Sequence, residues 1–245
     1  MKDKVIIITG GSSGIGKAAA LDFAKKGAQV LITGRREPAL NEVSTLNENI
    51  HPLVADSSDP SSAQLIIDTV ISKWGKIDVL VNNAGAGANA ALEDVSESKI
   101  SEIIAINLVG PSLLSAASLP YLKKSNGNII NITSAVAHKP MVNLSHYGAS
   151  KLALEYMTRT WALELAPDIR VNAIAPGPTY SGALIGMMGL SETQASEIEK
   201  QEAASLPLAR RGTPEEISQW IVWLAQPTNS WVTGQVIGVD GGFGL

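Results

Sequence analysis

The stretch KVIIITGGSSGIGKAAALDFAKKG, residues 4–27, combines a strand, a glycine-rich turn and a helix. Its first six residues are mostly β-branched and apolar, which predicts a buried strand, and the pattern from Lys17 onward predicts a helix. Gly10, Gly14 and Gly16 lie between the two. Glycines at such a junction let the backbone approach a phosphate, and the free N–H groups and dipole of the helix hold the anion. The stretch therefore predicts a pyrophosphate-binding turn.

The alternation of strand and helix continues along the whole chain. Short runs rich in apolar and β-branched residues recur at 4–9, 28–33, 51–54, 77–81, 128–133, 169–174 and 235–239. Continuous apolar strands separated by helices predict a parallel sheet that is covered on both faces. We therefore expect an α/β fold, a doubly wound parallel sheet (Rossmann fold) of about seven strands, with its ligand beyond the carboxyl ends of the strands.

Composition limits the classes of protein to which the chain can belong. The 245 residues are 45% hydrophobic and 17% charged, which predicts a single globular domain, 1–245. The net charge is −4 and the basic pairs are scattered, so we expect no nucleic-acid partner. Cysteine is absent and no histidine has a metal-binding partner at helical spacing, so we expect no metal site. The apolar runs are too short to span a membrane, and we expect a cytoplasmic protein.

Two predicted helices, 98–122 and 146–166, carry apolar residues nearly all the way round. A helix that is apolar on all sides must be covered on all sides. One face can pack on the sheet. The other face predicts a partner subunit and hence a homo-oligomer, a dimer or a tetramer, unless the chain's own loops cover it.

The segment 181–205 interrupts the strand and helix pattern. It contains three glycines and the flexible apolar pair Met187 and Met188, followed by a short polar helical pattern. Such an insertion between a strand and a helix predicts a lid over a substrate. The alternative is an ordinary surface excursion.

The glycine turn also fits a second motif. Gly10 to Gly14 matches G-x-S-x-G, the nucleophile elbow of α/β-hydrolases, in which Ser12 would be an acyl-transfer nucleophile. In hydrolases several strands precede the elbow, whereas this turn follows the first strand. The late histidines, His138 and His146, lie close in sequence to Tyr147. A serine hydrolase therefore remains only an alternative.

Arg35 and Arg36 follow the second predicted strand, about twenty residues after Gly14. A fold that binds NAD places an acidic residue there, against the 2′-hydroxyl of the adenosine ribose. A guanidinium pair instead suits a 2′-phosphate, so NADP(H) is the expected cofactor and NAD(H) the alternative. A solvated basic loop without a cofactor role is the other interpretation of the pair.

Tyr147 and Lys151 are four residues apart in SHYGASKLALEYM, residues 145–157. On a helix such a pair projects from one face at a separation of about 5–6 Å. A tyrosine titrates near ~10, and a close cation lowers its pKa. The pair therefore makes Tyr147 a candidate general acid and base.

Taken together, these residues resemble the short-chain dehydrogenase/reductase family. The resemblance follows the chain in order through TGGSSGIG at 9–16, Asp56, NNAG at 82–85, Asn107, Ser134, YGASK at 147–151, PG at 176–177 and TGQVIGVDGG at 233–242. LPLARRGTPEEI and WVTGQVIGVDGG look like the 3-oxoacyl carrier-protein reductases of that family. The resemblance implies hydride transfer between a nicotinamide and a carbonyl or secondary alcohol.

The resemblance also implies catalytic roles for four residues. Tyr147 would exchange a proton with the substrate oxygen, with its pKa lowered by Lys151 and by the positive nicotinamide of the oxidised cofactor. Lys151 would also bind the nicotinamide ribose. Ser134 would hydrogen-bond the substrate oxygen, and Asn107 would hold a water that connects Lys151 to solvent. Taken singly, Ser134 can equally be read as a cap and Asn107 as a local backbone-bonding residue.

The resemblance places the cofactor along a second set of residues. Arg35 would contact the 2′-phosphate and Asp56 the adenine, and the turn 176–181 would lie near the nicotinamide carboxamide. That turn is PGPTYS here, where the family usually has PG-x-I-x-T, so its side-chain geometry is left open. The implied cofactor-binding set is Gly10, Ser12, Ser13, Gly14, Ile15, Gly16, Arg35, Arg36, Asp56, Ser57, Asn83, Ala84, Gly85, Tyr147, Lys151, Pro176, Gly177, Thr179 and Ser181.

The substrate is not specified by these motifs. The residues expected around the pocket are mostly apolar with polar edges, which suits a medium-sized ketone, a sugar-derived carbonyl or a 3-oxoacyl thioester. They are Val136, His138, Met141, Val142, Leu144, His146, Met187 and Met188. A non-catalytic NADP(H)-binding regulator with the same fold is the remaining alternative.

Overall fold

A seven-stranded parallel sheet forms the centre of the computed structural model, which describes residues 1–245. The strand order is β3-β2-β1-β4-β5-β6-β7. The strands are β1 (Val5–Thr9), β2 (Gln29–Gly34), β3 (Ile50–Val54), β4 (Val79–Asn82), β5 (Asn128–Ile132), β6 (Arg170–Pro176) and β7 (Val236–Val239). All six pairings are parallel, which confirms the predicted doubly wound sheet.

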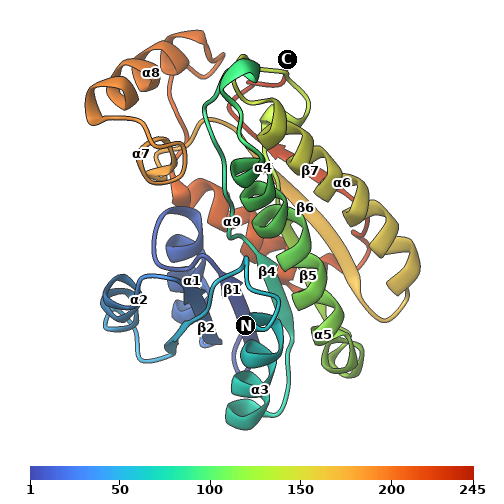
Figure 1. Cartoon of the computed structure of the whole chain (residues 1–245). Coiled ribbons are helices and arrows are strands. Elements are labelled where there is room, and N and C mark those ends of the chain that lie inside the picture. The colour runs from blue at the N-terminus through green and yellow to red at the C-terminus, as the bar shows by residue number, and fades with distance from the viewer.

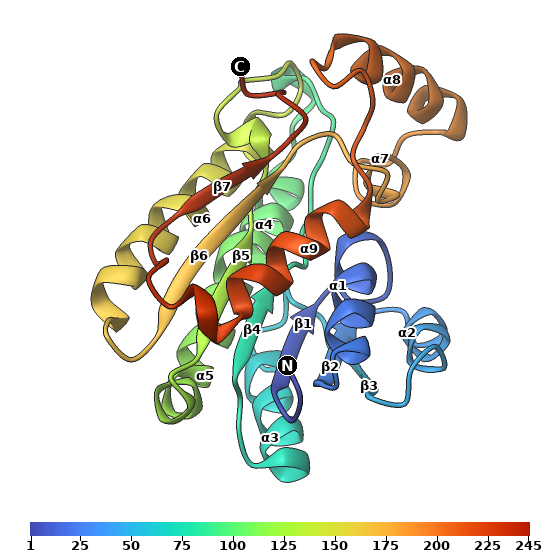
Figure 2. The same cartoon turned by 180° about the vertical axis from the view of Figure 1, so that it is seen from behind.

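Helices cover both faces of this sheet. Helices α3, α4, α5 and α6 lie on the side seen in Figure 1, and α1 and α9 lie on the side seen in Figure 2. The helices are α1 (Gly14–Lys25), α2 (Glu37–Ser44), α3 (Ser62–Trp74), α4 (Glu97–Ile104), α5 (Gly110–Ser125), α6 (Ser145–Leu165), α7 (Ala183–Gly186), α8 (Glu192–Ser205) and α9 (Pro214–Ala225).

The apolar strands feed two separate cores because successive strand residues point to opposite faces. In β1, Ile6 and Ile8 join the core under α1 and α9, whereas Val5 and Ile7 join the core under α3 and α5. All four side chains are buried. A continuous apolar run is therefore what this strand needs, and an alternating run would leave polar groups in one of the two cores.

The order of the strands reverses between β1 and β4, which are neighbours in the sheet but are separated in sequence by β2 and β3. Connections from the two strands diverge at this point, to α1 on one face and toward α4 on the other. A crevice is expected beyond the carboxyl ends of strands at such a switch point.

Residues 97–125 form one long helical stretch with a π-helical turn, Ala105–Val109, between α4 and α5. A helix is thus confirmed for 98–122, with an interruption that the apolar pattern does not reveal. By length and composition this stretch is apolar enough to cross a membrane. Here it packs against α3 and places Leu114 and Leu122 in the core, as a helix of the interior does.

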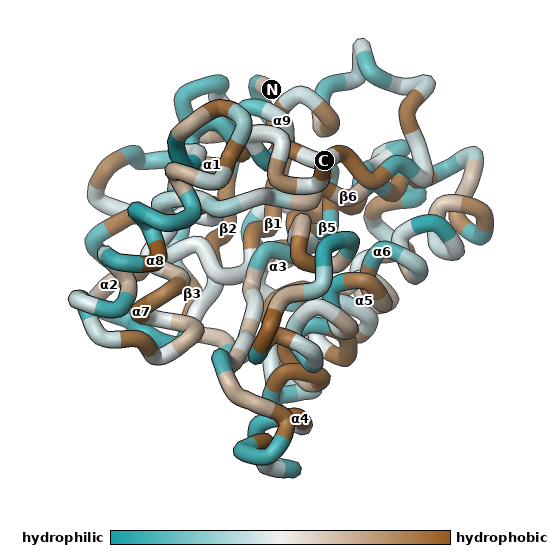
Figure 3. The backbone as a smooth tube through the Cα atoms, turned by 90° about the horizontal axis from the view of Figure 1, so that it is seen from above, coloured by the Kyte–Doolittle hydropathy of each residue, from teal (hydrophilic) through white to brown (hydrophobic).

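The segment 181–205 contains α7 and α8 and stands beyond the carboxyl ends of the strands (Figure 1). Seen from above, the tube around α7 is coloured as hydrophobic and α8 as mostly hydrophilic (Figure 3). Ser191 caps α8 through a capping box with Gln194. The apolar part of the segment therefore lies over the crevice, and the polar helix α8 reaches it through Glu202.

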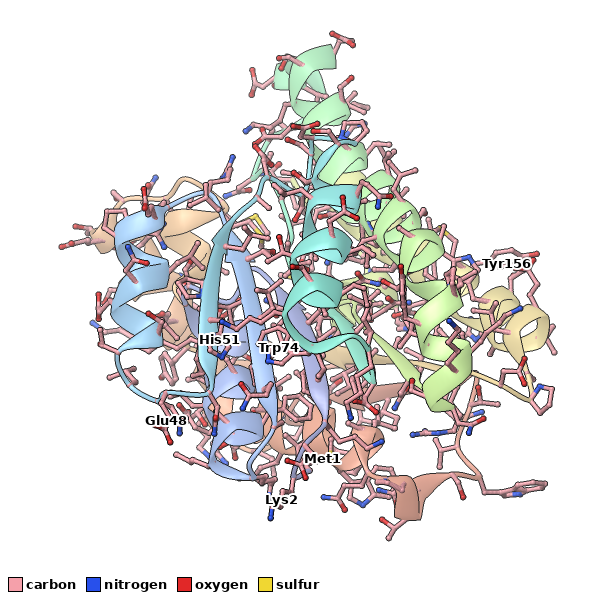
Figure 4. All side chains as sticks on the ribbon, turned by 90° about the horizontal axis from the view of Figure 1, so that it is seen from below. Met1, Lys2, Glu48, His51, Trp74 and Tyr156 are labelled. Carbon is pink, nitrogen blue, oxygen red and sulfur yellow. The ribbon has the colours of Figure 1, made fainter.

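At the far edge of the sheet, His51 on β3 packs against Trp74 of α3, with ring centroids 5.0 Å apart (Figure 4). The His51 Nε2 atom lies 3.0 Å from the Gln29 side-chain oxygen. This histidine therefore stabilises an edge of the sheet and lies apart from the crevice, in keeping with the structural role that its sequence context indicates.

Candidate active site

The glycine turn after β1 has the conformation that only glycine adopts readily. Gly10 and Gly14 have φ angles of +67° and +52°, in the left-handed region. A Cβ atom on Gly16 would lie 2.3 Å from the Gly10 carbonyl oxygen. The turn therefore closes tightly against the first turn of α1, and a side chain at Gly16 would force it open.

Hydrogen bonds from the end of β4 hold this turn in place. The Asn83 side-chain amide donates to the carbonyl oxygens of Thr9 at 2.8 Å and of Gly10 at 3.1 Å. The Thr9 hydroxyl in turn accepts from the backbone N–H groups of Asn83 and Ala84, both at 3.0 Å. Asn83 thus lines the predicted cofactor site, but its amide is engaged in supporting the turn. The part played by Thr9 was not predicted.

The N-terminus of α1 fits an anionic ligand. Ser13 is the N-cap residue, is exposed, and makes no capping hydrogen bond with its side chain. Its hydroxyl and the first backbone N–H groups of a twelve-residue helix are free to bind a phosphate. The residues present therefore fit the diphosphate of a dinucleotide.

One cavity of about 810 Å³ connects this turn with the Tyr147 and Lys151 pair. All the predicted cofactor-binding residues line it except Gly16, which is buried behind the turn. Of the four predicted catalytic residues, Ser134, Tyr147 and Lys151 line the cavity, and Asn107 lies fully buried behind it. A volume of this size accommodates a dinucleotide and a small substrate together.

The end of the cavity near β2 and β3 is basic. Arg35 and Arg36 are exposed, and neither takes part in an ion pair. Asp56, after β3, accepts hydrogen bonds from the Ser58 backbone N–H at 2.9 Å and the Ser58 hydroxyl at 2.8 Å. The two guanidinium groups are therefore available to an anion, whereas the carboxylate of Asp56 is held by hydrogen bonds within its own turn.

Tyr147 and Ser134 form the centre of the site. Tyr147 lies in the first turn of α6 and is only 9% exposed, and Ser134 lies two residues after the end of β5 at Ile132. Ser134 lies close enough to Tyr147 to oppose the rise in the pKa of its phenol. The Ser134 hydroxyl also accepts from the Val136 backbone N–H at 3.3 Å, so Ser134 is both a turn cap and a partner of Tyr147.

Lys151 lies one helical turn further along α6 and is buried. Its Nζ atom donates to the Ile132 carbonyl oxygen at 2.9 Å and lies 5.9 Å from the centre of the Tyr147 ring. A Cβ atom on Gly85 would lie 3.4 Å from Nζ, so the glycine leaves room for the ammonium group. Burial lowers the pKa of Lys151 to about 8.

The groups of the chain itself do not give Tyr147 the lowered pKa that its spacing from Lys151 predicts. Burial raises the pKa of Tyr147, and the hydrogen bond from Ser134 opposes that rise. The ammonium group is directed to the Ile132 carbonyl instead of the phenol oxygen. Spacing along the helix brought the two residues to one face, but the desolvation of the phenol outweighs the more distant cation.

Asn107 lies in the π-helical turn and bonds to the loop after β4. Its side-chain amide donates to the Ala86 carbonyl at 2.8 Å and to the Ser150 hydroxyl at 2.9 Å, and its oxygen accepts from the Ala86 N–H at 2.8 Å. These bonds fix the loop 83–86 against α6. Asn107 is therefore a long-range connector rather than the local backbone-bonding residue that its sequence context permits.

The hydrolase alternative lacks its geometry. None of the three histidines bonds to Ser12: His51 pairs with Gln29, His146 lies beside Ser145, and His138 lies 2.6 Å from Glu155. A serine nucleophile needs a base within hydrogen-bonding distance. Ser12 instead lines the glycine turn.

The expected substrate pocket is only partly correct. Val136, Met141, Leu144, Met187 and Met188 line the large cavity. His146 lines a neighbouring cavity of about 320 Å³, His138 faces Glu155, and Val142 is 88% exposed. Glu202, Arg211 and Phe243 also line this cavity, although no role at the site was predicted for them. Glu202 lies in the predicted lid 181–205 and Arg211 in LPLARRGTPEEI, but neither pattern indicated that these side chains reach the cavity.

The turn 176–181 reaches the cavity through Pro176, Gly177, Thr179 and Ser181. Thr179 is buried, its hydroxyl donates to the Gly177 carbonyl at 2.9 Å, and its own carbonyl accepts from Arg211 at 2.9 Å. Thr179, at the position where the family pattern has an aliphatic residue, therefore stabilises the turn through these buried hydrogen bonds.

The fold and this site define a class, the nicotinamide-dependent oxidoreductases built on a Rossmann sheet. Comparison with known proteins agrees. A family model described as enoyl-(acyl carrier protein) reductase matches residues 10–244. The 3-oxoacyl-[acyl-carrier-protein] reductase FabG of Thermotoga maritima is 38% identical over 99% of this chain and 98% of its own length. The 7alpha-hydroxysteroid dehydrogenase of Escherichia coli is 34% identical over 98% of this chain and 93% of its own.

Solved structures give the same result. The 3-ketoacyl-(acyl-carrier-protein) reductase of Brucella melitensis, complexed with NADH, matches with a TM-score of 0.92 and 30% identity, over 100% of this chain and 99% of that one. The chain belongs to the short-chain dehydrogenase/reductase family. Its members are oxidoreductases that bind a nicotinamide cofactor and act on small alcohols and ketones.

Proposed function

We propose that this protein is an NADP(H)-dependent reductase of carbonyl compounds, with Tyr147 as its general acid and base. The observation that supports this most directly is the arrangement around one cavity: the hydroxyls of Ser134 and Tyr147 and the buried ammonium of Lys151 share it with the glycine turn at the start of α1. That arrangement suits proton transfer beside a bound dinucleotide.

Each polar group has a task in this reaction. When bound, the reduced nicotinamide supplies a hydride to the carbonyl carbon. As the electron pair of the C=O bond moves to oxygen, the Ser134 hydroxyl stabilises the growing negative charge and Tyr147 delivers its proton there, which gives the alcohol. Lys151, whose pKa is about 8, exchanges protons near neutral pH and is suited to restore the proton of Tyr147.

The raised pKa of Tyr147 suits it to donate a proton. Because burial raises this pKa, the phenol keeps its proton at neutral pH and is ready to donate it. A proton donor is what reduction of a carbonyl needs, whereas oxidation of an alcohol needs a proton acceptor. At neutral pH Tyr147 is therefore in the protonated state that carbonyl reduction needs.

The preference for NADP(H) is supported by Arg35 and Arg36, which are exposed, unpaired and at the rim of the cavity. A guanidinium group binds a phosphate through two parallel hydrogen bonds, and at the position where a fold that binds NAD has an acidic residue this chain has Gly34, followed by Arg35 and Arg36. The substrate class proposed is a ketone or 3-oxoacyl compound of medium size, since the methionine and valine side chains make most of the remaining wall apolar.

The lid is part of the proposal. Met187 and Met188 of the segment 181–205 line the cavity, and a Cβ on Gly87 would lie 2.8 Å from the Met188 methyl group. The apolar end of the segment thus closes over the space beside Tyr147. We propose that it excludes water during hydride transfer.

A panel of ketones, sugar-derived carbonyls and 3-oxoacyl thioesters tests this function. Each compound is assayed with NADPH and with NADH by loss of absorbance of the reduced nicotinamide, in the wild type and in Tyr147→Phe. We expect higher kcat/KM with NADPH, and a loss of about 10²–10⁴-fold in kcat for the variant with its affinity for NADPH retained. Tight dinucleotide binding without turnover of any compound would instead indicate a regulator.

A further inference from the structure

Glu155 is a fully buried carboxylate that the proposed reaction does not use. It lies on α6 at position i+4 from Lys151 and i+8 from Tyr147, so the three residues form one stripe along the helix. We propose that Glu155 is a positioning residue that holds the segment 133–138 and thereby sets the Ser134 hydroxyl on Tyr147. This inference rests on the proposed function for its kinetic consequence, but not for its geometry.

The contacts of Glu155 lie at both ends of that segment. Its Oε1 atom accepts from the Thr133 hydroxyl at 3.1 Å, immediately before Ser134. Its Oε2 atom lies 2.6 Å from His138 Nε2, four residues after Ser134. Between the two contacts the chain makes a short 3₁₀ turn, Ala135–Ala137. One carboxylate therefore anchors the start and the end of the loop that carries Ser134.

Thr133 and His138 are connected to different parts of the fold. The Thr133 hydroxyl also lies 3.1 Å from the Ile174 carbonyl, and the Thr133 N–H donates to the same oxygen at 2.8 Å, which ties this end to β6. The His138 side chain is 49% exposed and has no other side-chain partner. Without Glu155 the β6 contact of Thr133 would remain, but His138 and the turn before it would lose their anchor on α6.

A buried carboxylate is costly unless something compensates it. Burial raises the pKa of Glu155, and His138, Thr133 and the nearby charge of Arg159 oppose the rise. A leucine at this position would pack against the same neighbours without that cost. The presence of a carboxylate therefore calls for a role that needs two acceptor oxygens, and bridging Thr133 and His138 is such a role.

Kinetics of two variants and their combination test the route through Ser134. Glu155→Gln keeps the shape of the side chain and an acceptor for Thr133, and removes the charge that faces His138. We expect kcat to fall by about tenfold, as for loss of a close contact with a charged group, with the affinity for NADPH and the KM within about twofold of wild type. In a Ser134→Ala background the same change should cost almost nothing, because the group on which it acts is gone.

The matched control is Glu164→Gln, which removes an exposed carboxylate from the same helix and should leave kcat unchanged. Replacement of His138 supplies a rescue test: His138→Gln keeps an N–H donor and should retain more activity than His138→Leu. A kcat within twofold of wild type for Glu155→Gln, or an equal loss with and without Ser134, would overturn the proposal.

A measurement without substrate separates this inference from the proposed function. The chain has four tyrosines, so with tyrosine labelled at the ring carbon that bears the hydroxyl, NMR resolves few signals, and Tyr147→Phe assigns one of them. The shift of that signal depends on the hydrogen bond to Ser134. Both Ser134→Ala and Glu155→Gln should move it in the same direction, and Glu164→Gln should not.

These outcomes are distinguishable. If no carbonyl is reduced but Glu155→Gln still moves the Tyr147 signal, the proposed function fails and the positioning role stands. If Ser134→Ala moves the signal and Glu155→Gln leaves it in place in a folded protein, the positioning role is wrong whatever the reaction.

Discussion

At the scale of single residues, the chemistry of the site depends on how deeply Lys151, Tyr147 and Arg35 are buried. Lys151 is buried with one carbonyl partner, Tyr147 is buried against Ser134, and Arg35 is exposed without a partner. Burial makes the charged form of Lys151 and of Tyr147 less favourable, whereas Arg35 keeps its charge available to a ligand. The consequences of Lys151 and Arg35 can be measured separately.

Lys151 makes the stability of the protein depend on pH. Its pKa falls from 10.5 to about 8 on folding, so the cost of burying the ammonium is fully present below pH 8. Between pH 8 and 10 the unfolded chain keeps a proton that the folded chain has released, and the free energy of unfolding therefore rises, by up to about 1.4 kcal/mol per pH unit. Urea unfolding at pH 7, 8, 9 and 10 should show this rise in the wild type relative to Lys151→Met. Parallel curves for the two proteins would contradict it.

Arg35 is expected to discriminate between the two coenzymes. Removal of its guanidinium takes away charge-assisted bonds to the 2′-phosphate, which NADH does not have. In Arg35→Ala we expect the Kd for NADPH to rise about tenfold or more and the Kd for NADH to stay the same, measured by calorimetry. The control is Lys123→Ala, which removes an exposed charge at the far end of α5. An equal change for both coenzymes would show that Arg35 does not contact the phosphate.

At the scale of elements, α8 is attached to the body of the protein by Arg211. This guanidinium is 5% exposed; its Nη1 atom donates to Glu199 at 2.5 Å, and Nε lies 3.1 Å from Glu202 Oε2, both carboxylates being on α8. Its Nη2 atom donates to the Thr179 carbonyl in the turn expected at the nicotinamide. A single side chain thus couples the lid segment to the cofactor turn.

Loss of this connection should loosen the lid. In Arg211→Met two partly buried carboxylates lose their counter-ion, and burial already raises the pKa of Glu202. We expect faster amide hydrogen exchange in residues 192–205 and 176–181, and a KM that rises more than kcat falls. Arg210→Gln, which affects an exposed pair with Glu216, is the control. Unchanged protection of α8 would mean that other contacts hold the lid.

At the scale of the whole molecule, helices on both faces of the sheet present apolar side chains to the outside. On α6, Leu152, Tyr156 and Leu163 are 46%, 72% and 84% exposed and lie on one stripe, and Figure 4 shows Tyr156 projecting from the body of the protein. On the opposite face, Trp220 and Trp223 of α9 are also exposed. Apolar surfaces of this kind favour self-association.

We therefore expect the protein to form a dimer or a tetramer through these faces. Sedimentation of the wild type should give that mass, and Tyr156→Glu with Leu163→Glu should reduce it, because two charges cannot be buried in an apolar contact without partners. Leu65→Glu, at an exposed apolar position of α3, should leave the mass unchanged. A monomeric wild type would mean that the outer face of α6 is simply solvated.

The sequence by itself determined the seven strands, their parallel order in outline and the position of the glycine turn. Each of these depends on local pattern: apolar runs of one strand length, helices between them, and glycines where the backbone must turn sharply. The same is true of the helix that carries Tyr147 and Lys151, since spacing of four residues fixes a common face. Local pattern also sufficed to indicate Arg35 and Arg36, because folds that bind NAD carry an acidic residue at a fixed distance from the glycine turn, and this chain has the two arginines there instead.

Only the tertiary structure decided which groups interact across the sequence. It directed Lys151 to the Ile132 carbonyl, buried the Tyr147 phenol enough to raise its pKa, and brought Arg211 and Glu155 beside the cavity and its supporting loop. Desolvation depends on everything that surrounds a group, and long-range ion pairs depend on where distant segments pack. A linear pattern contains neither, which is why spacing placed Tyr147 and Lys151 on one helix face but did not indicate that burial raises the pKa of Tyr147.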